Sequence, residues 1–371
     1  MQICKGLLLI VLICLSNNYL NAQNPVSYPK DTALSAPELN FEVLWHTFED
    51  NYAFFKLRNI DWKKSYNQYR PLVNAGTSDD SLFSVVSIML APFKDNHINV
   101  IMPGVKQFKA AKPSQFIKEF STDSLRHLYW TMVNQTLTGK GFGAIQNYGP
   151  GFNNIPLFSY RVSNRYGYLR FNRCFVDGDA DSKPDAAVAG KILDSIMEQA
   201  GKLQGLIIDV RENMGGNDEF AYEVASRFAS RKMVGMYKRT RVRGGKYEDF
   251  GKAETWFIEP TKNKAFLKPV VVLTNDKTVS AADVFAMIMK ELPAIKIIGT
   301  NTCGIYSDMY GFTLPNKWLV SLSNQRYYNN NMVCYEAKGT PVDINIENKK
   351  QDLATMNDPV ITAALKILNN K

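Results

Sequence analysis

Cysteine is scarce in this sequence, with five in 371 residues. Cys4 and Cys14 fall near the N-terminus, and Cys174, Cys303 and Cys334 form neither a disulfide framework nor a CxxC pair that could hold a metal. A bridge between Cys303 and Cys334 and a set of buried thiols are both compatible with the pattern. The sequence therefore excludes a small disulfide-stapled fold, and we expect neither a metal nor a cofactor.

Long apolar runs are also missing, because no stretch approaches the ~20 residues that a membrane-spanning helix needs. The run from Gly6 to Leu15 is shorter, follows Lys5 and precedes the small residue Ala22, which is typical of a secretory signal peptide. We expect cleavage after Ala22 and export to the periplasm or the extracellular space. A lipid anchor at Cys14 is the less favoured alternative, because Ile13 stands where a small residue is wanted.

Basic residues outnumber acidic ones, 44 to 35, which gives a net charge of +9. A basic protein can bind nucleic acid or anionic membranes. Here the basic residues are spread along the chain, so we expect no nucleic-acid partner. The densest group, Arg239, Arg241 and Arg243, alternates on a predicted strand. We favour a solvated strand face there over a subsite for acidic substrates.

Apolar periodicity divides the chain after the signal peptide 1–22. It predicts an N-terminal helical domain over 23–103, an intervening segment over 104–155, and a mixed α/β domain over 156–371. In the last part strands alternate with helices, so we expect a layered fold with a site at strand ends. The predicted strands are 166–171, 206–210, 269–273 and 295–298, and the predicted helices are 186–203, 218–231, 281–292 and 359–368.

Ser280 lies where a predicted buried strand passes through a polar turn into an amphipathic helix. At such a helix start, unpaired N–H groups and the positive end of the helix can stabilise an oxyanion. The N–H of Ala281 is one such donor. Serine is also a favoured N-cap residue in any protein, so a purely structural role is compatible with this segment alone.

A second polar turn follows the predicted strand 206–210 and ends in Gly215-Gly216. Glycines at this place let the backbone approach a ligand and direct N–H groups at it. The structural alternative is a tight turn that requires positive φ.

The chain has only three histidines, His46, His97 and His127. His46 and His127 lie within predicted helices, and we interpret both as structural. His97 follows a helix end in a polar turn before an extended segment, so it is the candidate general base.

Taken together, these segments resemble the S41 serine peptidases, the family of tail-specific and tricorn-core proteases. The tail-specific branch pairs its serine with a lysine, but the corresponding stretch Cys303-Gly304-Ile305-Tyr306 has none. The resemblance rests on five motifs in the family's order: Asp95-x-His97, Asp209-x-Arg211-x-Asn213-x-Gly215-Gly216, Thr278-x-Ser280-Ala-x-Asp283, Gly299-Thr-Asn-Thr-x-Gly304 and Tyr335-Glu336-x-x-Gly339-x-Pro341-x-Asp343.

The resemblance implies a tricorn-like triad in which Ser280 is the nucleophile, His97 the base and Glu336 the carboxylate that orients the base. It also implies a crotonase/ClpP-like ββα layered fold, here without a clear PDZ domain, and leaves 104–155 as a lid, a reduced PDZ or a new binding element. Ala281 and one of Gly215 and Gly216 would supply the oxyanion hole, while Asp209 and Arg211 brace the turn.

The function that follows is an exported serine peptidase acting on a peptide or an unfolded protein. The main alternative is a non-catalytic binding module of the same fold for an apolar ligand or peptide, because the retinoid-binding repeats of vertebrate retina resemble the same family. An esterase or amidase for small molecules would use the same triad. The sequence leaves the oligomeric state open.

Overall fold

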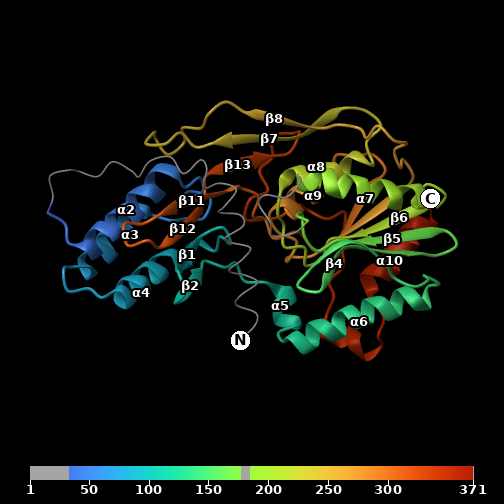
Figure 1. Ribbon diagram of the computed structural model, residues 1–371, viewed down its shortest axis with the longest axis horizontal. Helices are drawn as coiled ribbons and strands as arrows, with labels where there is room; N and C mark the ends of the chain where they lie inside the picture. The colour runs from blue at the N-terminus through green and yellow to red at the C-terminus, as the bar shows by residue number, and fades with distance from the viewer. Residues whose placement is uncertain (1–32, 177–183, 371) are drawn as a thin grey trace. The chain divides into compact units, whose positions relative to one another are not determined.

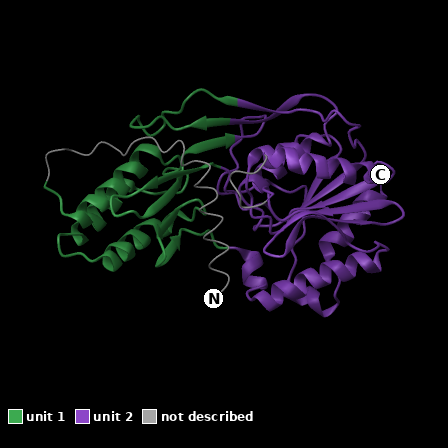
Figure 2. Ribbon diagram, viewed as in Figure 1, with its two compact units in different colours: residues 1–113, 238–254, 307–327 green, residues 114–237, 255–306, 328–371 purple. Residues whose placement is uncertain are grey.

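The computed structural model describes residues 33–176 and 184–370 (Figure 1). The expected signal peptide, 1–22, lies outside the described residues. The described chain forms two compact units (Figure 2). Unit 1 comprises the chain up to Pro113 with 238–254 and 307–327, and unit 2 comprises 114–237, 255–306 and the chain from Tyr328. Each unit thus gathers segments that are distant in the sequence.

The helices of unit 1 begin at residues suited to capping. Asp61 accepts a hydrogen bond from the N–H of Lys64 at 2.9 Å, and Ser78 accepts one from Ser81 at 3.3 Å. Trp45 and Trp62 stack at 5.8 Å, and each indole N–H donates to the other residue's carbonyl. The helices are α2 (Ala36–Asn51), α3 (Trp62–Tyr69) and α4 (Asp79–Leu90), with the 3₁₀ turns η1 (Arg70–Leu72) and η2 (Ala91–Phe93).

Unit 1 also contains an antiparallel sheet, which the sequence pattern does not predict. Its strand order is β11-β12-β1-β2, and Asn99 pairs with Ser321 across its centre. Two of its strands therefore come from near the end of the chain. The bounds are β1 (Asn99–Met102), β2 (Lys106–Lys109), β11 (Met309–Thr313) and β12 (Leu319–Ser323).

Unit 2 is built on a seven-stranded sheet of order β14-β10-β9-β6-β5-β4-β3. From β5 to β14 neighbouring strands run parallel, and β3, β4 and β5 pair antiparallel. The central strands are buried on both faces, as expected for parallel strands. The strands are β3 (Gln146–Phe152), β4 (Ile155–Val162), β5 (Tyr166–Arg170), β6 (Gly205–Asp209), β9 (Val270–Thr274), β10 (Ile295–Gly299) and β14 (Ile344–Asn345).

Helices cover the two faces of this sheet (Figure 1). On one face α6 and α10 share a buried cluster with sheet residues such as Tyr168 and Ile207. The helices α7, α8 and α9 pack against one another in sequence order, and Phe285 of α9 contacts Phe171 just after β5. The bounds are α5 (Gln115–Glu119), α6 (Asp123–Gly139), α7 (Asp185–Ala200), α8 (Asp218–Ser226), α9 (Ala281–Lys290), the 3₁₀ turn η3 (Lys350–Ala354) and α10 (Pro359–Asn369).

A third sheet has three strands in the order β13-β7-β8. These are β7 (Met233–Thr240), β8 (Glu254–Ile258) and β13 (Gln325–Tyr328), and the division between the units falls within them. Arg241, just beyond β7, is buried, and its Nη1 donates to the carbonyls of Glu49 and Tyr52 at 2.6 and 3.0 Å. The expectation of a solvated face is therefore wrong for Arg241, because this guanidinium terminates α2.

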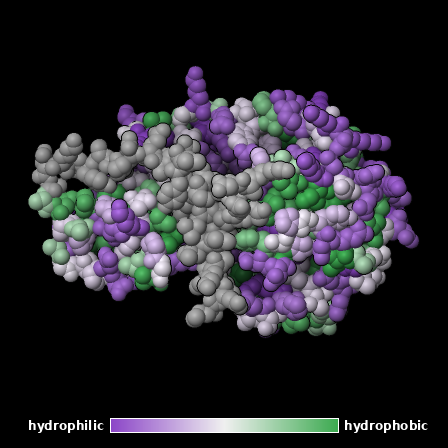
Figure 3. Space-filling view, in the orientation of Figure 1, coloured by the Kyte–Doolittle hydropathy of each residue, from purple (hydrophilic) through white to green (hydrophobic). Residues whose placement is uncertain are grey.

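The expected fold class, N-terminal helices with a layered mixed α/β part, is confirmed. No PDZ domain is recognisable in the described ranges, where 104–155 supplies β2, α5, α6 and β3. Within the same ranges, no helix is both long and apolar enough to cross a membrane. Figure 3 shows hydrophilic and hydrophobic side chains interspersed over the face that it presents.

Candidate active site

Ser280 occupies a strained turn between β9 and α9 in unit 2. Its φ of 61° and ψ of −126° lie in a region that residues other than glycine rarely adopt, at a cost of about 1–3 kcal/mol. The side chain is partly exposed, whereas Ala281, which follows it, is buried. Such a turn presents the hydroxyl while the next residues enter the packed core.

Gly215 lies against this turn. A Cβ built on Gly215 would stand 2.6 Å from the Ser280 Cβ and 2.6 Å from the Val279 carbonyl oxygen. The φ of Gly215 is +84°, so glycine is required both by the backbone and by the approach. The N–H of Val279 also donates to the carbonyl of Asn213 at 3.0 Å. The turn after β6 and the turn before α9 are thus joined around the serine.

The main-chain donors near Ser280 differ in their partners. Gly215 donates its N–H to the Asn213 side chain at 2.9 Å. Among the described residues, the N–H groups of Gly216 and Ala281 have no hydrogen-bond acceptor. Ala281 is the first residue of α9, where an N–H has no partner within the helix. One unengaged donor therefore follows the serine directly, and the other follows Gly215, which lies against the serine.

Asp283 lies on the first turn of α9 and is fully buried. Its carboxylate accepts hydrogen bonds from the N–H groups of Ser280 at 2.9 Å, Gly304 at 2.8 Å and Ile305 at 3.1 Å. Burial raises the pKa of Asp283 to about 6, although these hydrogen bonds and one with Thr302 oppose the rise. The sequence motifs alone predict no role for Asp283, although its spacing from Ser280 is that of a capping box, a signal that could have revealed it.

Glu336 is also buried and is connected to Ser280 through two consecutive residues. Its Oε2 accepts the N–H of Tyr306 at 2.9 Å, while the carbonyl of Ile305 accepts the N–H of Ser280 at 3.1 Å. Ala337, which follows Glu336, donates its N–H to the carbonyl of Gly304 at 2.7 Å. The segment 304–306 therefore connects the candidate nucleophile with the candidate orienting carboxylate.

His97 lies in unit 1, in the turn that precedes β1. Its N–H donates to Asp95 Oδ1 at 3.0 Å, and its carbonyl accepts the hydroxyl of Ser321 at 2.7 Å. Asp95 is held in turn by the Tyr52 hydroxyl at 2.9 Å and by Arg58 at 3.6 Å. The backbone of the turn is therefore fixed, whereas Nδ1 of the imidazole is buried without a partner among the described residues.

Burial lowers the pKa of His97 to about 4, and Lys109 and Arg58 add to that effect. The charges of Asp95 and Asp308 oppose it without cancelling it. The imidazole is consequently neutral at pH 7, which is the form that a general base requires.

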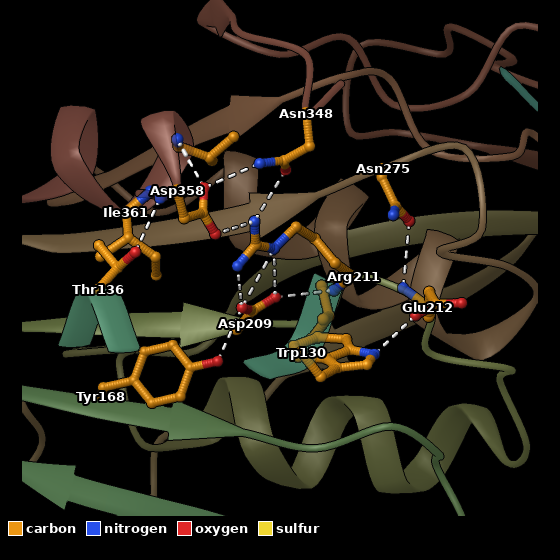
Figure 4. A network of polar contacts seen from close by, with 12 residues as sticks. Trp130, Thr136, Tyr168, Asp209, Arg211, Glu212, Asn275, Asn348, Asp358 and Ile361 are labelled. Atoms are coloured by element: carbon orange, nitrogen blue, oxygen red, sulfur yellow. Dashed lines mark hydrogen bonds and ion pairs between the residues drawn. The ribbon is translucent and has the colours of Figure 1, made fainter. Parts of the chain in front are cut away.

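Asp209 and Arg211 form a buried ion pair of 2.5 Å at the end of β6 (Figure 4). Arg211 also reaches Asp358, at the start of α10, at 2.8 Å. The hydroxyl of Tyr168 donates to Asp209 at 2.8 Å. Both residues of the pair are fully buried, so they brace the turn.

Trp130 connects α6 to the same turn (Figure 4). Its indole N–H donates to Glu212 Oε2 at 2.7 Å, and the guanidinium of Arg170 lies 3.5 Å from the centre of its ring. Asn275 accepts the N–H of Glu212 at 3.1 Å. The turn that ends in Gly215-Gly216 is thus held from β9 and from α6.

Metal ligands and disulfides were also sought among the described residues. No cluster of three metal-ligating side chains is present within 33–176 and 184–370. Cys174, Cys303 and Cys334 carry thiols and are not joined in a disulfide.

Comparison with known proteins places these segments among peptidases. The model of peptidase family S41 matches residues 165–346, and the model of the tricorn protease C1 domain matches residues 36–91. The first match contains Ser280, Glu336 and both glycines of the turn after β6. It does not contain His97.

Solved structures agree with this assignment. A candidate peptidase from Parabacteroides merdae is 26% identical, with a TM-score of 0.74 over 90% of this chain and 97% of that one. Mature CPAF in complex with lactacystin has a TM-score of 0.64 over 91% of this chain and 99% of its own, but only 14% identity, so it shows the fold alone.

A carboxy-terminal-processing protease of Bartonella bacilliformis is 26% identical over 52% of this chain and 41% of its own length. The chain therefore spans less than half the length of the curated relatives that it matches.

Proposed function

We propose that this chain is a member of peptidase family S41 and a serine-type peptidase that hydrolyses peptide bonds. The observation that carries the proposal is the strained conformation of Ser280, which is followed by the unengaged N–H of Ala281 and lies against Gly215, the neighbour of the unengaged N–H of Gly216. Strain of this kind persists where the surroundings impose it and is concentrated at functional sites. A serine that served only as a helix cap would not need it.

In the proposed acylation step, Ser280 Oγ attacks the carbonyl carbon of the scissile bond while His97 accepts the hydroxyl proton. The C–N bond of the tetrahedral intermediate then breaks, and His97 gives the proton to the leaving amine. A water molecule attacks the acyl-enzyme by the same route, which releases the acid and restores the serine. Glu336 orients the imidazole and stabilises its protonated form.

We assign the oxyanion donors to Gly216 and Ala281. The N–H of Gly215 is engaged by Asn213, so Gly215 contributes through its close approach to Ser280. Each oxyanion donor stabilises the transition state by ~3 kcal/mol.

Export by the segment 1–22 is part of the same proposal. Mass spectrometry of the protein recovered from its host is expected to give Gln23 as the first residue. A lipidated Cys14 at the N-terminus would instead establish the anchored form.

The triad is tested by labelling the purified mature protein with a fluorophosphonate probe. We expect the wild type to react, Ser280→Ala to abolish the reaction, and His97→Ala and Glu336→Gln to slow it. Ser78→Ala is the matched control, because Ser78 caps α4 as a serine without a proposed chemical role. A folded wild type that never reacts would make Ser280 a helix cap and leave the binding module of the same fold.

The substrate class is a peptide or an unfolded protein. Hydrolysis of a peptide library, set against hydrolysis of small esters, separates a peptidase from an esterase that uses the same triad.

A further inference from the structure

We infer that Asp283 is a positioning residue for the proposed hydrolysis. Its carboxylate holds Ser280 in its reactive conformation and fixes the segment 304–306, which binds Glu336. The inference rests on the proposed function and extends it to a residue with no role in the proton transfers. It depends only on contacts within unit 2.

The contacts of Asp283 reach both parts of the candidate site. One oxygen, Oδ2, accepts the N–H of Ser280 at 2.9 Å and the N–H of Ile305 at 3.1 Å, and Oδ1 accepts the N–H of Gly304 at 2.8 Å. The next residue, Tyr306, donates its N–H to Glu336 at 2.9 Å. A single buried carboxylate therefore sets the distance between the turn that holds Ser280 and the segment 304–306, in which Tyr306 binds Glu336.

Asp283 stabilises the strained backbone conformation of Ser280. The left-handed φ of Ser280 is unfavourable by itself, so neighbouring contacts must hold it. The N–H of Ser280 is held twice, by Asp283 and by the carbonyl of Ile305. Since Ile305 is itself bound to Asp283, loss of the carboxylate weakens both restraints together.

The protonation state of Asp283 decides whether these contacts survive. Three N–H groups and the Thr302 hydroxyl are directed at the carboxylate, and a protonated acid would place a donor among them. Tyr306 is an ionisable group that interacts with Asp283: burial raises its pKa well above the ordinary value, and the charges of Asp283 and Glu336 add to that rise. The pKa of about 6 for Asp283 places the loss of the carboxylate just below neutral pH.

The test is the pH dependence of fluorophosphonate labelling and of peptide kcat in the wild type and in Asp283→Asn. In the wild type we expect the rate to fall through pH 6, the pKa of Asp283, well above the pKa of about 4 for His97. Asp283→Asn is expected to lower the labelling rate and kcat by about 100-fold with little change in KM, because the nucleophile is misplaced. Its remaining activity should fall only near pH 4.

Asp358→Asn is the matched control. Asp358 is as buried as Asp283 and also caps a helix of unit 2, accepting the N–H groups of Val360 and Ile361 at 2.8 and 3.3 Å. A loss of stability alone would appear in both variants. Only Asp283→Asn should remove the fall near pH 6.

The outcomes separate this inference from the proposed function. A wild type that is inactive at every pH defeats the proposed function, and the inference with it. An active wild type whose rate falls only near pH 4 overturns the inference alone, even where Asp283→Asn fails to fold. Equal rates for the wild type and a folded Asp283→Asn overturn it as well.

Discussion

Gly215 and Ser280 are in such close contact that no side chain fits between them: a Cβ on Gly215 would lie 2.6 Å from the Cβ of Ser280. The turn after β6 therefore packs directly against the turn that holds Ser280. Any atom added at Gly215 must displace Ser280 or the carbonyl of Val279.

Gly215→Ala is therefore expected to lower the rate of fluorophosphonate labelling by about 100-fold, as small displacements of reacting groups do. Gly141→Ala is the matched control, because Gly141 also has positive φ, +82°, but open space around its Cβ position. Both variants bear the backbone cost of about 1–2 kcal/mol. Equal labelling by the two variants would show that the contact with Ser280 has no consequence for reactivity.

Arg211→Met is expected to destabilise the protein by about 3–5 kcal/mol, because it leaves the buried carboxylates of Asp209 and Asp358 without their cation. Urea denaturation measures the change. Lys290→Ala removes the partner of Asp343 in a pair that is partly exposed, and should cost under about 1 kcal/mol. Similar midpoints for the two variants would contradict a bracing role for Arg211.

Stability should fall on acidification because of His97. Its pKa of about 4 in the folded protein lies below the ordinary value of 6.5, so the unfolded chain binds the proton first as the pH falls. The contribution is complete above pH 6.5 and is lost progressively between pH 6.5 and 4.

Asp283 has the opposite effect on the free energy of unfolding between pH 6 and 3.8. Its pKa is raised in the folded state, so the folded protein binds this proton first and gains stability as the pH falls. Comparison of melting temperatures between the wild type and His97→Gln from pH 7 to 4 isolates the histidine. The difference between them should narrow as the pH falls. A constant difference would show that the burial of His97 does not shift its pKa.

Arg241→Met should destabilise the protein by about 1–3 kcal/mol, because two carbonyls at the end of α2 lose their donor. Arg243 belongs to the same alternating group but is exposed, so Arg243→Met should change stability by no more than about 0.5 kcal/mol. Thermal unfolding of the two variants provides the comparison, and equal melting temperatures would contradict the capping role of Arg241.

Local patterns were sufficient for much of unit 2. The buried strands and the helix after Ser280 lie where apolar runs and periodicity predict them, since those signals arise from neighbours in the sequence. The helix expected to reach Arg231 ends at Ser226. Beyond it, the N–H groups of Arg227 and Phe228 donate to the carbonyls three residues back, those of Val224 and Ala225, as in a 3₁₀ turn.

Long-range pairing was not predictable in the same way. Nothing near Asn99 indicates that its strand pairs with Ser321, and nothing in the alternating arginines reveals that Arg241 meets the end of α2. The motifs make Ser280 a candidate and their spacing points to Asp283, but the contacts of Asp283 with Gly304 and Ile305 depend on a loop that the fold brings to it. The triad that joins Ser280, His97 and Glu336 remains a prediction.

The pairing of β1 with β12 has a consequence for the order in which the protein matures. Asn99 leaves the ribosome 222 residues before its partner Ser321. The unit that begins the described chain therefore cannot be completed before residue 327 has been made, and its first helices must wait for strands made more than 200 residues later. Long loops of this kind slow folding. A chain truncated before β11 would lose the sheet that supports the turn of His97, although every residue of that turn would still be present.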